Sequence, residues 1–427
     1  MTRSLSYAAY GFLGLPLAMS ALPVYVQIPA YYSTQLGMAL VSVGWVLFLA
    51  RFVDALQDPL LGYLIDRMRG TLTWWFCAAG FMLAIAFLGL WLPPVSGSHL
   101  IVWLALALIL AYVAHSMLNI AYLAWGARIV STGGRQSSAL LGAAAWREAA
   151  GLVGGIAASV IPSFIISDSQ SRAQHAEHLG WYCLAFAIIL ALSIAALLTA
   201  APVWKRSRAT ADGESVGKGT ARQWRILASN DAFKALLIPY FINAISVSIP
   251  ATLVLFFIND RLQASQYSAA FLATYFISAA VGLPCWVKLV SSWGVALSWR
   301  LGMMLAIVAF ISASMLSAGQ IMPFFVICAA SGFALGADLA LPPVMLAQVI
   351  QADVPPAAYY GIWTLLGKFA LAISGLALPV LASLNYHPGH PAGAELAWVY
   401  AGVPCGLKCI ALFLLMRMVN IAESRTA

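Results

Sequence analysis

An arginine and two carboxylates lie close together inside a strongly apolar stretch of the sequence. Arg51, Asp54 and Asp58 are spaced i, i+3 and i+7, which puts all three on one face of a helix. Ionisable groups in such a stretch are costly, so they are expected to be paired and to face a protein interior or a water-filled cavity. Two acids held close together repel each other, and a bound proton or Na⁺ relieves that repulsion. The spacing therefore predicts a cation site, and a purely structural ion-pair cluster is the alternative.

Other ionisable residues also interrupt apolar stretches. Lys368 needs a carboxylate partner if it is buried, and Asp54 or Asp58 is the expected one, although a structural lysine is the alternative. Arg147 is expected to face a cavity, with a gate ion pair as the alternative. Lys408 is expected to extend its ammonium to the membrane surface. Three residues keep open roles: a helix contact for Glu148, function or helix packing for Asp338, and a proton relay or a hydrogen-bonded core position for His115.

The composition determines which elements must position these groups. The chain has 427 residues, of which 63% are hydrophobic and 8% charged, whereas soluble domains contain about a quarter charged residues. A helix that crosses a bilayer needs about 20 mostly apolar residues. By that measure the sequence predicts an all-α membrane protein with twelve spans, at approximately 8–30, 40–64, 72–93, 99–125, 138–166, 180–201, 233–258, 266–290, 297–317, 322–347, 357–384 and 396–419.

The only long polar connection, residues 202–232, is rich in Lys and Arg and divides the chain into two halves. We expect a six-helix bundle over 1–201, a basic cytoplasmic linker over 202–232 with a surface helix near 222–230, and a second bundle over 233–427. Most of the 22 Lys and Arg residues fall in loops on one side of the spans. Because positive charge marks cytoplasmic loops, both termini are expected to be cytoplasmic.

Two six-helix halves joined by a basic loop resemble the major facilitator superfamily. The sequence Gly62-x-x-x-Asp66-Arg67-x-Arg69 is similar to the cytoplasmic gating motif of that superfamily, where the glycine permits close helix approach and the acid pairs in one gate state. We assign Arg51 to the same predicted gate. Residues 282–288 of the second half partly match this motif but lack the acid, so an internal repeat is only weakly indicated. Solutes in this superfamily bind near the bilayer midplane, between halves that rock against each other.

Four local motifs resemble one family within it, the glycoside–pentoside–hexuronide:cation symporters, of which melibiose permease is a member. They are Arg51-x-x-Asp54-Ala-x-x-Asp58-Pro59-x-x-Gly62-x-x-x-Asp66, Asn119-Ile-Ala-Tyr122-Leu-Ala-Trp125-Gly, Ala337-Asp338-Leu-Ala-Leu-Pro342, and Gly361-Ile-Trp363-Thr-Leu-Leu-Gly-Lys368.

The resemblance implies a role for each matched position. It makes Asp54 and Asp58 ligands of a coupling H⁺ or Na⁺, with Asn119 and Ser116 as neutral helpers. Some members have a third carboxylate at the position of Asn119, so H⁺ coupling is favoured over strict Na⁺ selectivity. The substrate candidates are Lys368, Arg147 and Asp338, with aromatic walls from Tyr10, Tyr25, Tyr122, Trp125 and Trp363.

Two departures from the family affect the expected substrate. Sugar-binding members carry an acid in their first helix, but residues 7–32 here contain no acid or base. The family's two acids at the end of helix 10 are replaced by Gln348 and Gln351. We predict symport of a sugar, a glycoside or a related solute, with an amphipathic anion such as a lysolipid as the first alternative and a non-transporting receptor or scaffold as the second.

Other classes of function lack their sequence features. There is no Ser/His/Asp constellation on a polar loop, no Cys/His metal-ligand spacing and no phosphate-binding glycine loop, so an enzyme is not expected. A repeated filter or an acidic ring, as in channels, is also missing from the sequence. We expect a monomer in the lipid bilayer of a bacterial inner membrane, with a small-molecule substrate, no nucleic-acid partner and no cofactor besides the coupling ion.

Overall fold

The computed structural model describes residues 3–67, 73–129, 136–167, 172–201, 227–350 and 356–426. Over these ranges all regular structure is helical, no strand occurs, and twelve segments are long and apolar enough to cross a membrane. The all-α class and the twelve spans are therefore confirmed.

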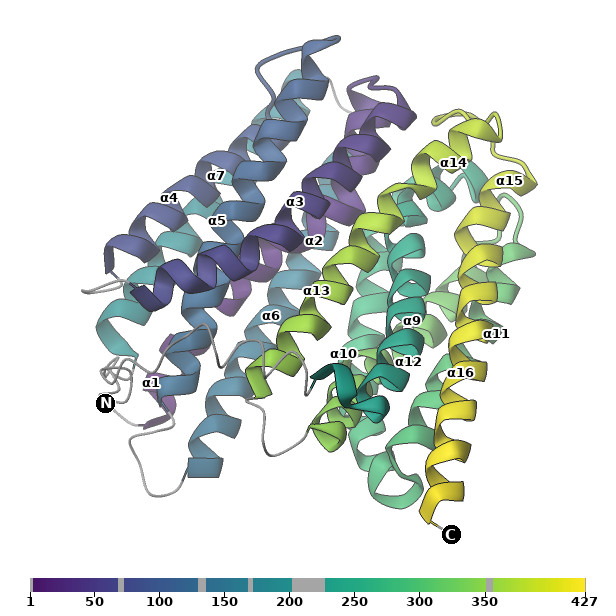
Figure 1. The fold of residues 1–427 in the computed structure, drawn as a ribbon. Coiled ribbons are helices and arrows are strands. Elements are labelled where there is room, and N and C mark those ends of the chain that lie inside the picture. The colour runs from purple at the N-terminus through teal and green to yellow at the C-terminus, as the bar shows by residue number, and fades with distance from the viewer. Residues whose placement is uncertain are drawn as a thin grey trace. The chain divides into compact units, whose positions relative to one another are not determined.

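The N-terminal helices form one compact unit, which also takes in Ser265–Ala273. Figure 1 shows its long helices running side by side. Its elements are α1 (Arg3–Gly11), α2 (Gly14–Ala30), the π turn η1 (Tyr31–Gln35), α3 (Leu40–Arg67), α4 (Thr73–Trp91), α5 (His99–Ile129), α6 (Gln136–Ser167) and α7 (Arg172–Ala200).

The C-terminal helices form the second unit, from Ser207–Ala264 and Thr274–Ala427. Most of the predicted linker 202–232, with most of its surface helix, lies outside the described residues, so the three-part division stays a prediction. The elements here are α9 (Asp231–Phe256), η4 (Phe257–Arg261), most of α10 (Ser268–Trp293), α11 (Val295–Ser314), α12 (Ile321–Val349), α13 (Pro356–Gly375), α14 (Ala377–Ser383), α15 (Ala394–Ala397), η6 (Trp398–Gly402) and α16 (Val403–Thr426). The short helix η5 (Ser265–Tyr267) and the first residues of α10 belong to the first unit.

Large apolar side chains lie both inside the units and on their outer surfaces. Trp91 and Trp299 are fully buried, whereas Trp74 and Phe81 are mostly exposed. A soluble protein could not expose so many large apolar groups, but a bilayer solvates them while each helix satisfies its own backbone hydrogen bonds. The distribution fits an integral membrane protein.

The first spans of the two units end in the same way, which supports the internal repeat that the sequence only weakly indicates. After α2, the amide of Leu36 donates to Tyr31 O and the amide of Met38 donates to Tyr32 O. After α9, Leu262 donates to Phe257 O and Ala264 to Ile258 O, with the same five- and six-residue spacings. Both helices therefore close with a π turn at corresponding positions.

In the second unit, Asn230 ties the start of α9 to two other helices. Its side-chain oxygen accepts from the amide of Phe233, capping the helix. Its amide nitrogen donates to Val349 O at the end of α12 (2.9 Å) and to the hydroxyl of Tyr359 on α13 (3.1 Å). One buried side chain thus fixes three helix ends together.

In the first unit, α2 crosses closely over α6 because Gly154 has no side chain. A Cβ at this position would overlap the backbone carbonyl of Leu15. We expect Gly154→Ala to destabilise the protein by about 1–3 kcal/mol or more, since a backbone carbonyl cannot move aside as a flexible side chain does. Thermal unfolding of the purified protein measures the change.

Gly151, one turn earlier on α6, gives a matched control. A Cβ there would meet only Gly14 O, at 3.9 Å, which is ordinary contact. Gly151→Ala is expected to be neutral or slightly stabilising, because alanine has the higher helix propensity. Equal effects of the two substitutions would contradict the close crossing.

Candidate functional site

The predicted acidic cluster forms on α3 in the N-terminal unit. Asp54 is buried and Asp58 is half-buried, one turn apart on the helix. Ser116 of α5 donates its hydroxyl to Asp54 Oδ1 (3.2 Å), and Gln57 Nε2 donates to the same oxygen (2.9 Å). Ser116, expected as a neutral helper of the cation site, thus contacts Asp54, whereas Gln57 is a contact that the sequence analysis missed.

Arg51 is buried in the same cluster. Its Nε donates to the hydroxyl of Tyr112 on α5 (3.3 Å), and its guanidinium lies 5.9 Å from the ring centroid of Tyr25 on α2. An arginine over an aromatic face is held by a cation–π attraction. Tyr25, predicted as a wall of the substrate cavity, therefore also contacts the ionic cluster.

Two further predicted residues lie on α5 within one turn of Ser116. Asn119 is half-buried, one turn beyond Ser116. The ring nitrogen Nδ1 of His115 lies 3.1 Å from the hydroxyl of Ser20 on α2. That contact agrees with the hydrogen-bonded position considered for His115.

The predicted aromatic residues Tyr10 and Tyr122 pack against each other, with ring centroids 4.5 Å apart. The hydroxyl of Tyr10 donates to Tyr122 O (3.2 Å), and that of Tyr122 donates to Tyr10 O (3.0 Å). Trp125, one turn further along α5, packs edge-on against Phe76 at 5.8 Å. These three aromatic residues are thus buried where α5 meets α1 and α4.

The remaining predicted residues of this unit are described less completely. Arg147 is half-buried on α6, where the start of α2 comes close: a Cβ at Gly14 would meet Arg147 O at 2.7 Å. The side chains of Glu148, Asp66 and Arg67, the surroundings of Gly62, and all of Arg69 lie outside what the structure describes.

In the C-terminal unit, the predicted residues Trp363 and Lys368 lie on α13. The ring of Trp363 stacks on Tyr240 of α9, with centroids 3.4 Å apart and planes 18° apart. Lys368 is half-buried, and a Cβ on its neighbour Gly367 would lie 3.0 Å from the Tyr240 hydroxyl. Tyr240 was missed because nothing in the sequence pairs it with α13.

The comparisons with known proteins agree with this architecture. The family described as MFS/sugar transport protein matches residues 7–423, nearly the whole chain. The chain belongs to that family. The match confirms the family resemblance that the motifs indicated, and it makes the protein a major facilitator transporter, a class that does not contain enzymes.

Solved structures of transporters share the fold. A variant of the nucleoside transporter NupG has a TM-score of 0.73 and 14% identity, covering 98% of this chain and 100% of its own. Tetrameric PepTSo2 has a TM-score of 0.70 and 14% identity, covering 100% and 99%. A bacterial homologue of the human lysosomal transporter Spinster, inward-facing, has a TM-score of 0.62 and 15% identity, covering 98% and 96%. No curated protein sequence matches the chain.

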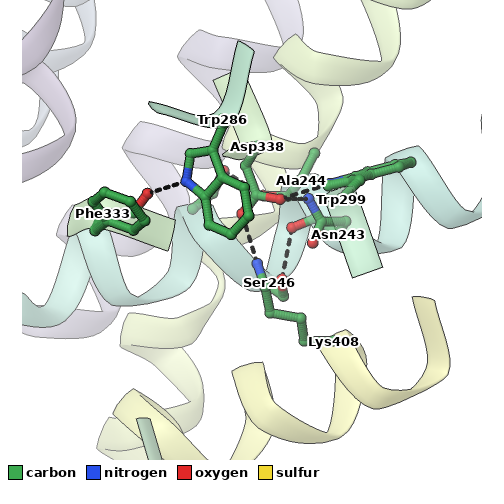
Figure 2. Close-up of polar contacts among 9 residues, drawn as sticks. Asn243, Ala244, Ser246, Trp286, Trp299, Phe333, Asp338 and Lys408 are labelled. Carbon is green, nitrogen blue, oxygen red and sulfur yellow. Dashed lines mark hydrogen bonds and ion pairs between the residues drawn. The ribbon is translucent and has the colours of Figure 1, made fainter. Parts of the chain in front are cut away.

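The transporter has one buried ion pair that the sequence analysis did not anticipate. Asp338 Oδ2 of α12 lies 2.8 Å from Lys408 Nζ of α16, with side-chain exposures of 7% and 5%. Asp338 Oδ1 accepts from Asn243 Nδ2 on α9 (3.0 Å) and from Trp299 Nε1 on α11 (2.9 Å). Figure 2 shows these four side chains converging from four helices.

The prediction that Lys408 extends to the membrane surface is wrong. The last span runs from Ala394 to Met418, so Lys408 lies near its middle rather than near an end. From there the ammonium cannot reach water, and it pairs with Asp338 inside the unit. The substrate role of Asp338 stays a prediction, but its carboxylate is fully engaged within the helix bundle.

Proposed function

We propose that this transporter is a cation-coupled symporter of a small organic solute, such as a sugar, a glycoside or a related compound. The coupling ion is H⁺ or Na⁺, bound at Asp54 and Asp58 with Ser116 and Asn119 in support. The observation that carries the proposal is the Asp54 carboxylate, which is buried in an apolar helix and accepts hydrogen bonds from two neutral side chains. Burying an acid in a membrane span costs about 2.5–3.5 kcal/mol. A helix that only spans the membrane has no need of such an acid, so its presence indicates a function.

Coupling requires that the ion and the substrate favour the same conformation. Lys368 is the residue we assign to this link, because the sequence predicts Asp54 or Asp58 as the partner of its ammonium when no ion is bound. Binding of H⁺ or Na⁺ at the acids releases Lys368 to meet the substrate, together with Arg147. Alternating access between the two halves then carries both across the membrane, with Asp66, Arg67 and Arg69 in the cytoplasmic gate.

A second candidate substrate is an amphipathic anion such as a lysolipid. Two observations favour it: residues 7–32 contain no acid to bind sugar hydroxyls, and α13 carries both the half-buried Lys368 and Trp363, which stacks on Tyr240. Aromatic rings and an ammonium on one helix suit a ligand with an apolar part and an anionic group. We also propose that the transporter is a monomer in a bacterial inner membrane, with both termini in the cytoplasm.

Ligand-dependent thermal stabilisation of the purified protein tests both candidates. Glycosides, uronates and lysolipids are compared with and without Na⁺, at two pH values and at constant ionic strength. A true ligand stabilises the native state by RT ln(1 + [L]/Kd), about 2.7 kcal/mol at a hundredfold excess over Kd. A glycoside that stabilises only with Na⁺ or at the lower pH supports ion-coupled sugar transport.

Two variants separate the candidates. Asp58→Asn is expected to abolish the dependence on Na⁺ or pH, and Lys368→Ala to abolish stabilisation by anionic compounds. Stabilisation by a lysolipid that disappears in Lys368→Ala supports the second candidate. Ligand binding that ignores both Na⁺ and pH in the wild-type protein contradicts the cation site.

A further inference from the structure

The buried ion pair of the C-terminal unit lies in surroundings that would suit a free cation. Asp338 is where α9, α11, α12 and α16 meet, and each of the other three helices contributes one polar side chain to its carboxylate (Figure 2). Two neutral donors, Asn243 and Trp299, hold Oδ1. They leave Oδ2 to the ammonium of Lys408.

Asn243 brings a second oxygen to this place. Its side chain is 3% exposed, and its Oδ1 is buried without a hydrogen-bond partner within the part of the chain that the structure describes. The oxygen is bonded to the same carbon as the nitrogen that donates to Asp338, so it lies beside the carboxylate. A buried acceptor without a partner is unfavourable, and an oxygen-binding cation would satisfy it.

The Lys408 ammonium is itself a monovalent cation at the end of a flexible stem. It occupies the position opposite Oδ2 where a free cation would bind the carboxylate. We propose that Asp338 and Asn243 form a monovalent-cation site in the C-terminal unit, and that Lys408 fills this site in the present structure as a tethered cation. When the ammonium is removed, a free cation takes its place between the carboxylate and the amide oxygen.

This site goes beyond the proposed function and does not depend on it. It lies on α9, α12 and α16, whereas Asp54 and Asp58 lie on α3 of the other unit. It also gives Asp338 an ion-binding role in place of the substrate contact predicted from the sequence.

The test uses the full-length protein with Asp54→Asn and Asp58→Asn as background, so that the first cation site cannot respond. Lys408→Ala is added, and Na⁺ or methylammonium is titrated against choline at constant ionic strength. Methylammonium reproduces the lysine head group, whereas choline is too bulky to enter. We expect the Tm of the Lys408→Ala protein to rise by several degrees with the logarithm of cation concentration.

Three controls assign the response to this site. Adding Asp338→Asn to Lys408→Ala is expected to abolish it, and adding Asn243→Ala to weaken it severalfold. Lys368→Ala in the same background removes a different membrane lysine and is expected to create no response. A Lys408→Ala protein that responds no more than the background overturns the proposal.

The proposal can still be tested if the Lys408→Ala protein fails to fold. If Lys408→Ala cannot be isolated in choline but can be isolated in methylammonium, the site has accepted the free cation. If it cannot be isolated in any of these cations, while Asp338→Asn with Lys408→Ala can, the position excludes free cations and the proposal fails.

Discussion

Asp338→Ala is expected to destabilise the protein by about 3–5 kcal/mol, the usual cost of leaving one partner of a buried ion pair uncompensated. The substitution leaves the Lys408 ammonium, 5% exposed, without its carboxylate. It also removes the acceptor of the Trp299 indole and the Asn243 amide, both of which donate to Asp338 Oδ1. Each of these donors adds a desolvation penalty of its own. Thermal unfolding of the purified protein in detergent measures the loss.

The double variant Asp338→Leu with Lys408→Met is the control for this experiment. It replaces both charges by apolar groups of similar size, and such replacements are often neutral or stabilising. We expect it to recover most of the stability lost in Asp338→Ala. A change below about 1 kcal/mol in Asp338→Ala, the value of an exposed pair, would contradict the buried geometry.

Asp54→Asn is expected to remove the cation dependence of substrate binding while the protein stays folded. The amide keeps the shape of the carboxylate and can still accept the hydrogen bonds from Ser116 and Gln57, but it carries no charge for H⁺ or Na⁺. Coupling free energies between two sites usually change affinity by about 5–150-fold. We expect that factor to fall to about one, as measured by substrate binding with and without the ion.

Asp231→Asn is the matched control, because it makes the same chemical change outside the cluster. Asp231 is 73% exposed and lies 2.8 Å from Lys234 in the first turn of α9. An exposed pair of this kind contributes little, so substrate binding should keep its full cation dependence. If Asp54→Asn keeps that dependence as well, Asp54 is not a cation ligand.

The sequence alone determined the helices, the family and part of the ionic cluster. Apolar stretches of about 20 residues specify spans because only a helix satisfies its backbone inside a bilayer, so length and composition suffice. Arg51 and Asp54 share one helix, and their spacing alone puts them on the same face. The resemblance to a known family then indicated Ser116, on another helix, as the neighbour of Asp54, and the structure has that hydrogen bond.

The tertiary structure decided the contacts for which no motif gave a partner. Asp338 and Lys408 are 70 positions apart, and Tyr240 and Trp363 lie on different helices of the same unit. Such contacts depend on how each helix is rotated about its axis and where it crosses its neighbours. Hydropathy carries little of that information in a membrane protein, because the lipid-facing and buried sides are both apolar. The predicted span 396–419 already put Lys408 near its middle, but only packing could supply Asp338 as its partner.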